Sequence, residues 1–201
     1  ILSGAGVSGS TAGMPENFLL RSIDRFGNVQ DTYSANVVVQ MLEHTFYNGT
    51  FTNVSQHVDI IPLTDGFYNM TYFVTFSGRY HLAVTINAVH LAGSPFAADI
   101  LPTDFSLVDS RAPGISPTTT DKTNGIAIAF FVVANDEFGN QQTQGGDLFG
   151  AVSVHIRGEQ VDSPANIVDK ADGTYAIFYS ATQQGVYTIS IKFGLEHMGA
   201  S

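Results

Sequence analysis

The chain has 201 residues, of which 44% are hydrophobic and only 13% are charged, and it contains no cysteine. Its formal net charge is −10 and Lys and Arg form no cluster, which excludes a surface that follows the phosphates of a nucleic acid. The absence of cysteine excludes disulfides, thiolate metal sites and cysteine nucleophiles.

Short runs of Val, Ile, Thr, Tyr and Phe alternate with Gly, Pro, Asn and Asp, a pattern typical of β-strands joined by turns. One pair of motifs, Asp-Gly-x-Tyr followed by Gly-x-Tyr, occurs twice. It begins at Asp65 in the first half and at Asp172 in the second. Since about 100 residues suffice for a β-sandwich, the repeat predicts two domains, residues 1–101 and 102–201.

In the first domain, residues 1–13 contain four glycines and predict a short first strand followed by a flexible connection. Phe18 and Leu20 belong to the second strand, which leads into a turn at Asp24. Five further strands are expected over residues 36–42, 57–63, 67–76, 80–87 and 96–101. Residues 48–53 are expected to form an inserted loop between the third and fourth strands.

In the second domain, residues 99–109 are expected to lead in as a short linker broken by proline. Phe131 and Val133 should belong to the second strand, ahead of a turn at Asp136. Further strands are expected over residues 152–156, 165–168, 174–180 and 186–193. The printed sequence ends where the seventh strand should begin, so we expect the second domain to be truncated before its last strand.

The tyrosines of the fifth strands are expected to lie in the cores. Because side chains alternate between the two faces of a strand, Tyr72 and its counterpart Tyr179 should point inward. In the first domain the same alternation places Asn69 and Thr71 on the outward face.

The motifs, in this order, resemble the filamin-type immunoglobulin-like repeat. They are an Asp-x-x-Gly-Asn turn after the second strand, Asp-Gly-x-Tyr before the fifth, Gly-x-Tyr before the sixth and Gly-Ser-Pro-Phe before the seventh. The first domain departs from the family at Phe67, where Thr is usual and where the second domain has Thr174. The resemblance implies an all-β chain of two tandem seven-stranded sandwiches, without catalytic residues and without cofactors.

The resemblance also implies a protein partner that adds an extended segment to the exposed edge of the third strand and packs toward the fourth. The residues on this edge are Val37, Val39 and Met41 in the first domain and Val152, Val154 and Ile156 in the second. The inserted loop of the first domain lies beside the edge and can obstruct or reshape it.

Three Asn-x-Ser/Thr sequons, at Asn48, Asn53 and Asn69, occur in the first domain and none occurs in the second. Two fall in the inserted loop and the third on an outward strand face, so all three could carry a glycan without disturbing the core. Since surface placement is what glycan acceptors of secreted proteins require, the sequons indicate an extracellular location.

Other candidate sites have simpler explanations. The Asp24 and Asp136 turns resemble fragments of calcium loops but lack their alternating carboxylates, and an Asx-type turn is the better interpretation. Calcium between the domains, through Asp99, Asp104 or Asp109, stays open. The six histidines do not have the spacing of a metal site. No nucleophile elbow, phosphate loop or dinucleotide fingerprint occurs, so we expect no enzyme.

We therefore expect a non-enzymatic, protein-binding piece of a cell-surface adhesion ectodomain, similar to the filamin-like repeats of gamete-attachment proteins. It would recognise a protein on the opposing cell through loops or an open strand edge, and would reach the membrane only through parent segments outside this chain. One alternative is a cytosolic filamin-like rod segment that joins actin scaffolds to membrane-protein tails. Another is a carbohydrate-binding module with Phe46, Tyr47 and Phe51 as its aromatic platform.

Overall fold

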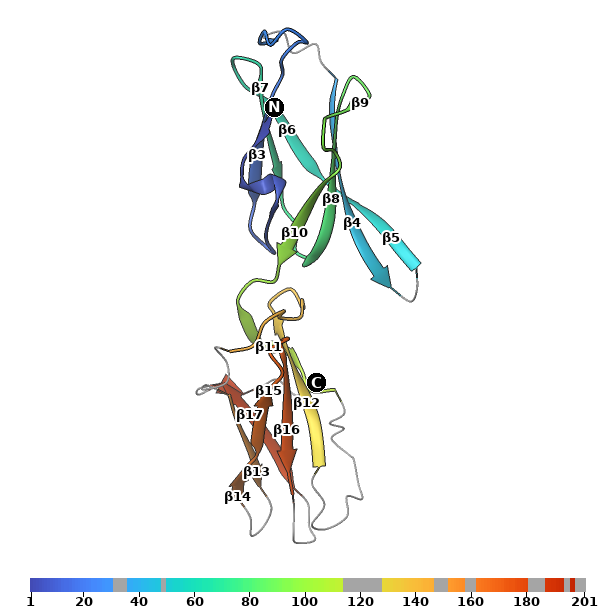
Figure 1. Ribbon diagram of the computed structural model, residues 1–201. Coiled ribbons are helices and arrows are strands. Elements are labelled where there is room, and N and C mark those ends of the chain that lie inside the picture. Colours follow the sequence, from blue (N-terminus) through green and yellow to red (C-terminus); the bar gives the residue numbers. More distant parts are fainter. Residues whose placement is uncertain are drawn as a thin grey trace. The chain divides into compact units, whose positions relative to one another are not determined.

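The computed structural model describes residues 1–30, 36–47, 50–113, 128–146, 152–157, 162–180, 187–193 and 196–197. The chain divides into two compact units, Ile1–Leu101 and Pro102–Ser201. The described residues form β-strands and one short 3-10 helix, so the all-β prediction is confirmed (Figure 1). The described residues contain no helix that is long and apolar enough to cross a membrane.

The first unit consists of two sheets. Its strands are β1 (Leu2–Ser3), β2 (Gly9–Thr11), β3 (Glu16–Arg21), β4 (Val37–Tyr47), β5 (Thr50–Gln56), β6 (Val58–Pro62), β7 (Phe67–Tyr72), β8 (Gly78–Ile86), β9 (Val89–His90) and β10 (Phe96–Leu101). One sheet has the order β1-β3-β7-β6. The other has the order β2-β10-β8-β4-β5, with β9 beside β8.

The core of the first unit lies between these sheets, as the alternation predicts. Tyr68, Met70 and Tyr72 on β7 are buried, while the residues between them are half-buried on the other face. Tyr72 is only 2% exposed, and its hydroxyl donates a hydrogen bond of 2.9 Å to the carbonyl of Gly6. The inward orientation of Tyr72 is therefore confirmed.

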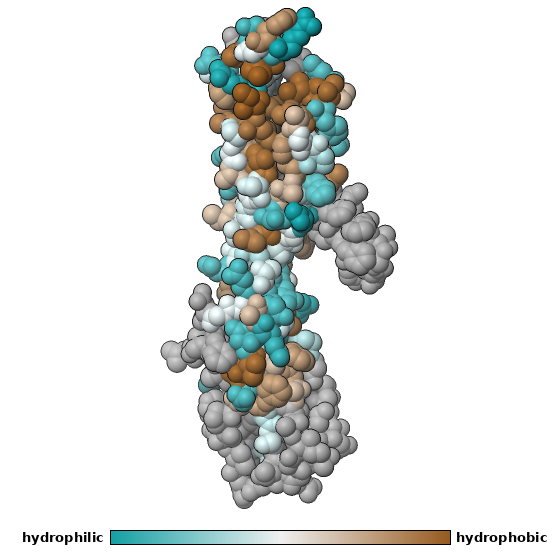
Figure 2. All heavy atoms as spheres, viewed as in Figure 1, coloured by the Kyte–Doolittle hydropathy of each residue, from teal (hydrophilic) through white to brown (hydrophobic). Residues whose placement is uncertain are grey.

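Several large hydrophobic side chains of the first unit lie on its surface. Phe26 is 74% exposed, Phe73 is 55% exposed and Ile61 is 53% exposed. Figure 2 shows hydrophobic residues, in brown, next to one another on the visible face of this unit. Single exposed apolar residues are common in proteins, whereas neighbouring ones call for a physical explanation.

The prediction of a flexible connection in residues 1–13 is wrong. After β1 has paired antiparallel with β3, a short 3-10 helix (η1, Ala5–Val7) carries the chain to the other sheet. There β2 pairs parallel with β10, with Gly9 opposite Asp99. A Cβ atom at residue 9 would lie 2.0 Å from the Asp99 carbonyl oxygen, so this close pairing requires glycine.

Residues 50–53 of the inserted segment belong to a strand and not to the expected loop, and residues 48 and 49 lie outside the described residues. The third strand extends beyond its predicted end to Tyr47, and β5 returns antiparallel to it, with Met41 opposite Gln56. The pattern of β5, Thr-Phe-Thr-Asn-Val-Ser-Gln, has few apolar residues to indicate a buried face. Backbone pairing with β4 accounts for its strand conformation.

The second unit repeats the two-sheet arrangement. Its strands are β11 (Phe105–Arg111), β12 (Ile128–Asp136), β13 (Val152–Arg157), β14 (Asp162–Pro164), β15 (Asn166–Asp169), β16 (Thr174–Tyr179), β17 (Thr188–Phe193) and β18 (Glu196–His197). The sheet orders are β11-β12-β16-β15 and β14-β13-β17-β18. Since β11 begins at Phe105, the expected linker 99–109 is too long, and only three residues separate β10 from β11.

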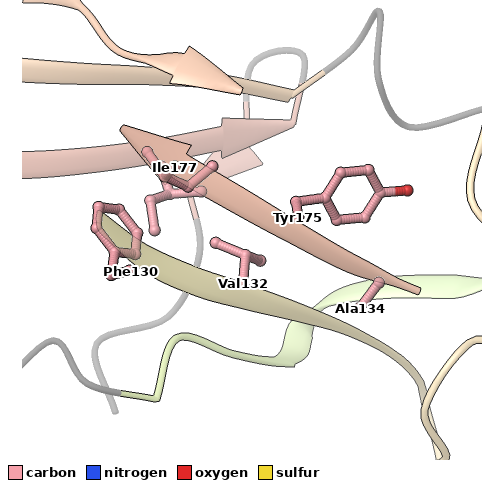
Figure 3. Close-up of a cluster of buried hydrophobic side chains, with 6 residues drawn as sticks. Phe130, Val132, Ala134, Tyr175 and Ile177 are labelled. Carbon is pink, nitrogen blue, oxygen red and sulfur yellow. The ribbon is translucent and has the colours of Figure 1, made fainter. Parts of the chain in front are cut away.

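A cluster of buried side chains from β12, β16 and β17 forms the core of the second unit. Its members on the first two strands are Phe130, Val132, Ala134, Tyr175 and Ile177 (Figure 3). Phe131, which lies between the buried Phe130 and Val132 on β12, is 49% exposed. Tyr179 is half-buried and packs against the edge of the cluster, so it is less enclosed than Tyr72.

Candidate partner-binding edges and glycan acceptors

The outer edge of β4 is only partly open. On one side β4 pairs with β8 from Val37 to Glu43, and on the other it pairs with β5 from Met41 to Tyr47. The expectation that Met41 lies on the open edge is therefore wrong, because β5 pairs with β4 at this residue and the Met41 side chain is fully buried. No described strand pairs with the outer side of β4 before Met41.

The backbone N–H and C=O groups of Val39 point toward the open side of β4. On β8, Val84 donates its N–H to Ser94 Oγ at 2.9 Å, and its carbonyl accepts from the N–H of Leu91 at 3.0 Å. Both groups of Val84 thus point away from β4, which makes Val39 and Val84 a non-hydrogen-bonded pair of the ladder. Val39, and Val37 two residues earlier, therefore direct their N–H and C=O groups to the open edge.

The strand β6 forms the neighbouring border of the opposite sheet. It is the last strand in the order β1-β3-β7-β6 and approaches β4. Its side chains alternate, with Val58 buried and Asp59 exposed, and His57 Nε2 lies 3.0 Å from the Asp59 carboxylate. The strand β6 therefore carries a buried apolar residue next to an exposed acidic residue.

In the second unit, the predicted edge strand β13 is open at one end only. All six of its residues pair with β17, while His155 to Arg157 also pair with β14. The expectation that Ile156 lies on the open edge is therefore wrong, since Ser163 of β14 lies opposite it. No described strand pairs with the outer side of Val152 and Val154, so partner binding there stays a prediction.

The three sequons fall on different parts of the first unit. Asn48 lies outside the described residues. Asn53 belongs to β5, where its backbone lies opposite that of His44. Asn69 lies on β7 with a half-buried side chain, and its Nδ2 donates to Thr71 Oγ1 at 3.5 Å. Asn69 and Thr71 share the face opposite to the core, as the alternation predicts.

The Asp24 and Asp136 loops are Asx turns. In each, one carboxylate oxygen accepts two backbone N–H groups at 2.8–2.9 Å, and the other accepts the side-chain amide of the final Asn. In the first turn these bonds, above all that from the Asn28 side chain, lower the pKa of Asp24. The described residues contain no group of three His, Cys, Asp or Glu side chains placed to hold a metal ion.

The expected aromatic platform lies on the β4–β5 pair. The backbone register places Phe46 opposite Phe51 and Tyr47 opposite Thr50. Cross-strand neighbours of this kind are about 4.5–5.5 Å apart at Cβ. The register is therefore compatible with a platform, and carbohydrate binding stays a prediction.

A comparison with protein families finds the same repeat in both halves of the chain, as the duplicated turns suggest. The Filamin/ABP280 repeat matches residues 1–97 and again residues 102–201. The chain belongs to the filamin repeat family. Mouse filamin-C is 32% identical over 132 residues, which is 65% of this chain and 4% of that protein. Filamin-A of Drosophila melanogaster is 25% identical over 137 residues, 68% of this chain and 6% of that protein. The two filamin repeats thus span a small fraction of these relatives.

Solved structures share the fold of the two filamin repeats at low sequence identity. Invasin, a bacterial integrin-binding protein, matches with a TM-score of 0.61 and 16% identity, over 98% of this chain and 37% of invasin. InvD of Yersinia pseudotuberculosis matches with a TM-score of 0.53 and 18% identity, over 98% of this chain and 53% of InvD. These likenesses show the immunoglobulin-like fold.

Proposed function

We propose that the two filamin repeats are a non-enzymatic, protein-binding part of a cell-surface adhesion glycoprotein of the gamete-attachment type. The repeats lie on the extracellular side of the plasma membrane and recognise a protein on the opposing cell. Contact is made through loops or by addition of an extended segment to the open edges at Val37, Val39, Val152 and Val154. Segments of the parent protein beyond this chain attach it to the membrane.

The observation that carries this proposal is the position of Asn69 and Thr71. Side chains on β7 alternate between buried and half-buried, and the acceptor lies on the face opposite to the core. Of the other two acceptors, Asn53 belongs to β5, which pairs with β4. An acceptor on an outward face suits a protein that passes through the secretory pathway.

A second candidate is a cytosolic filamin-type rod segment that links actin scaffolds to the tails of membrane proteins. The 32% identity to mouse filamin-C favours it. In that setting the sequons are unmodified. Glycan occupancy therefore distinguishes the two candidates.

The location is tested by producing the 201-residue chain in a eukaryotic secretory host. Enzymatic removal of N-glycans should lower its mass, and peptide mapping should place the modification at Asn48, Asn53 or Asn69. Asn→Gln variants of the three acceptors serve as controls. An unchanged mass after enzyme treatment would favour the cytosolic candidate.

The open edge is tested by selecting binders from a displayed library of random peptides. We expect the selection to enrich segments with alternating apolar residues, which pair as strands. Val39→Pro removes the N–H group that faces the open edge without removing a bond to β8, so it should abolish binding at this edge. Val39→Ala retains the N–H and should bind normally. Equal binding to both variants would exclude the β4 edge as the site.

A further inference from the structure

The outer face of the sheet β1-β3-β7-β6 has Asn69 near its centre. Leu19 on β3 lies directly opposite Asn69 on one side, and Ile61 on β6 lies directly opposite on the other. Ile61 is 53% exposed and Leu19 is half-buried. Since cross-strand neighbours are about 4.5–5.5 Å apart at Cβ, the only acceptor on β7 is flanked at close range by two apolar side chains.

An aromatic ring completes this surface. Phe67 is two residues before Asn69 and Thr71 is two residues after it, so all three side chains share one face of β7. The distance from residue i to residue i+2 along a strand is about 6.6 Å, which a single sugar ring can span. The guanidinium group of Arg21 lies over the Phe67 ring, 5.0 Å from its centroid, and holds the ring from the β3 side.

The corresponding face of the second unit lacks this combination. The counterparts of Phe67, Asn69 and Thr71 on β16 are Thr174, Ala176 and Phe178. Ala176 is 1% exposed and lies between Phe131 and Val168, which face it from the neighbouring strands. Phenylalanine and the acceptor asparagine thus occur together on the first unit, while the second has a small side chain between apolar ones.

We infer that the first N-acetylglucosamine of a glycan on Asn69 packs against the Phe67 ring and covers Leu19 and Ile61. The glycan is then a structural part of the first unit, because it removes apolar surface from water. In the modification, Asn69 Nδ2 loses a proton and bonds to C1 of the sugar. The bond from C1 to the diphosphate of a polyprenyl-linked oligosaccharide donor breaks, and the lipid diphosphate leaves. The inference rests on the extracellular location proposed above.

The test uses the 201-residue chain with Asn48→Gln and Asn53→Gln, so that Asn69 is the single sequon acceptor. Protein from a secretory host is trimmed to one N-acetylglucosamine and compared with the same chain from bacteria, which lacks the sugar. Phe67→Thr, the residue that the second unit has at this position, is made in both forms. Calorimetry measures the melting temperature, and hydrogen exchange of peptides from β3, β6 and β7 assigns the transition to the first unit.

We expect the single sugar to raise the melting temperature of the first unit by about 4 °C or more when residue 67 is Phe. With Thr at this position the same sugar should change it by less than about 1 °C, while peptides of the second unit exchange at the same rate in all four proteins. Equal shifts for Phe and Thr, or no shift with an occupied Asn69, would overturn the inference and leave the extracellular location intact. An unmodified Asn69 would overturn the inference as well, while occupancy of Asn48 or Asn53 in the unsubstituted chain would leave the extracellular location supported.

Discussion

At the scale of single residues, Tyr72 shows how one side chain joins distant parts of the first unit. Its ring is 6.4 Å from that of Phe18, measured between centroids, and its hydroxyl donates to Gly6, near the start of the chain. Burial, followed by the negative charge of Glu16, raises the pKa of Tyr72 to about 12. The phenol therefore keeps its proton in the folded state at pH values where an exposed tyrosine loses it.

Tyr72→Phe should lower the free energy of unfolding of the first unit by about 1–3 kcal/mol at pH 7, because the buried carbonyl of Gly6 loses its donor. Denaturant titration followed by circular dichroism measures this loss. Tyr72→Ala should cost about 3–5 kcal/mol, since it also leaves a cavity. A loss below about 1 kcal/mol for the Ala variant would contradict the buried position.

Alkaline pH should also destabilise the first unit through Tyr72. The unfolded state ionises near pH 10.0, whereas the folded state keeps the proton up to about pH 12. Stability is therefore fully present below pH 10 and is lost as pH rises through this window. The Tyr72→Phe variant should lose less stability over the same range, as denaturation curves at pH 8 and pH 11 would show. Equal losses would mean that Tyr72 does not cause the effect.

Gly9→Ala should destabilise the first unit by about 2 kcal/mol or more, because both the backbone conformation and the contact with Asp99 are unfavourable for Ala. Gly78 is a matched control. Its φ of +149° is close to the +141° of Gly9, and a Cβ atom there meets nothing within 4 Å. Gly78→Ala should cost about 1 kcal/mol, from backbone strain alone. Thermal unfolding of both variants measures the difference.

At the scale of elements, the two Asx turns have the same local geometry but different surroundings. Asp136 is fully buried, and its Oδ2 accepts a further bond of 3.0 Å from the N–H of Thr103. The Thr103 carbonyl in turn accepts from Gln142 Nε2 at 2.7 Å. The turn in the second unit thus holds the residues that precede β11, a role for which the Asp24 turn has no described counterpart.

Asp136→Ala should therefore destabilise the second unit by about 3 kcal/mol or more, since it leaves several buried donors without an acceptor. Asp24→Ala should cause a smaller loss in the first unit, because water can replace the carboxylate there. Calorimetry of the two variants compares the effects. Equal losses would show that burial of the turn does not matter.

The sequence predicts the strands well where alternation and paired motifs agree, as for β7, β8 and β10. It does not predict β5, since the polar side chains of this strand leave its formation to backbone pairing with β4. Nor does it predict β2, because this strand begins with Gly9 and glycine is more common in loops than in strands. The exposed position of Phe131 could not be predicted, because the run from Ile126 to Ala134 is apolar throughout and has no alternation.

The candidate site was predictable in part for the same reasons. The alternation on β7 was sufficient to place Asn69 and Thr71 outward. Met41 and Ile156 are not on the open edges because β5 and β14 pair with them, and both strands have weak sequence signals. Edge strands are defined by what does not pair with them, and this depends on every other segment of the chain.

At the scale of the whole molecule, each compact unit has its own hydrophobic core. Phe18, which is 0% exposed, and Phe130, which is 5% exposed, lie at corresponding positions of β3 and β12. Phe18→Ala and Phe130→Ala should each cost about 3–5 kcal/mol, each in its own unit. Hydrogen exchange should show faster opening in the substituted unit alone. Faster exchange in both units for either variant would indicate a shared folding transition.

The parallel pairing of β2 with β10 has a mechanical consequence for the first unit. These strands lie close to the two ends of the first unit, so tension along the chain drags them in opposite directions, parallel to their own length. The bonds of the ladder then carry the load jointly and rupture together instead of unzipping one after another. The first unit should therefore withstand a sudden pull on its two ends better than a unit whose end strands separate one bond at a time.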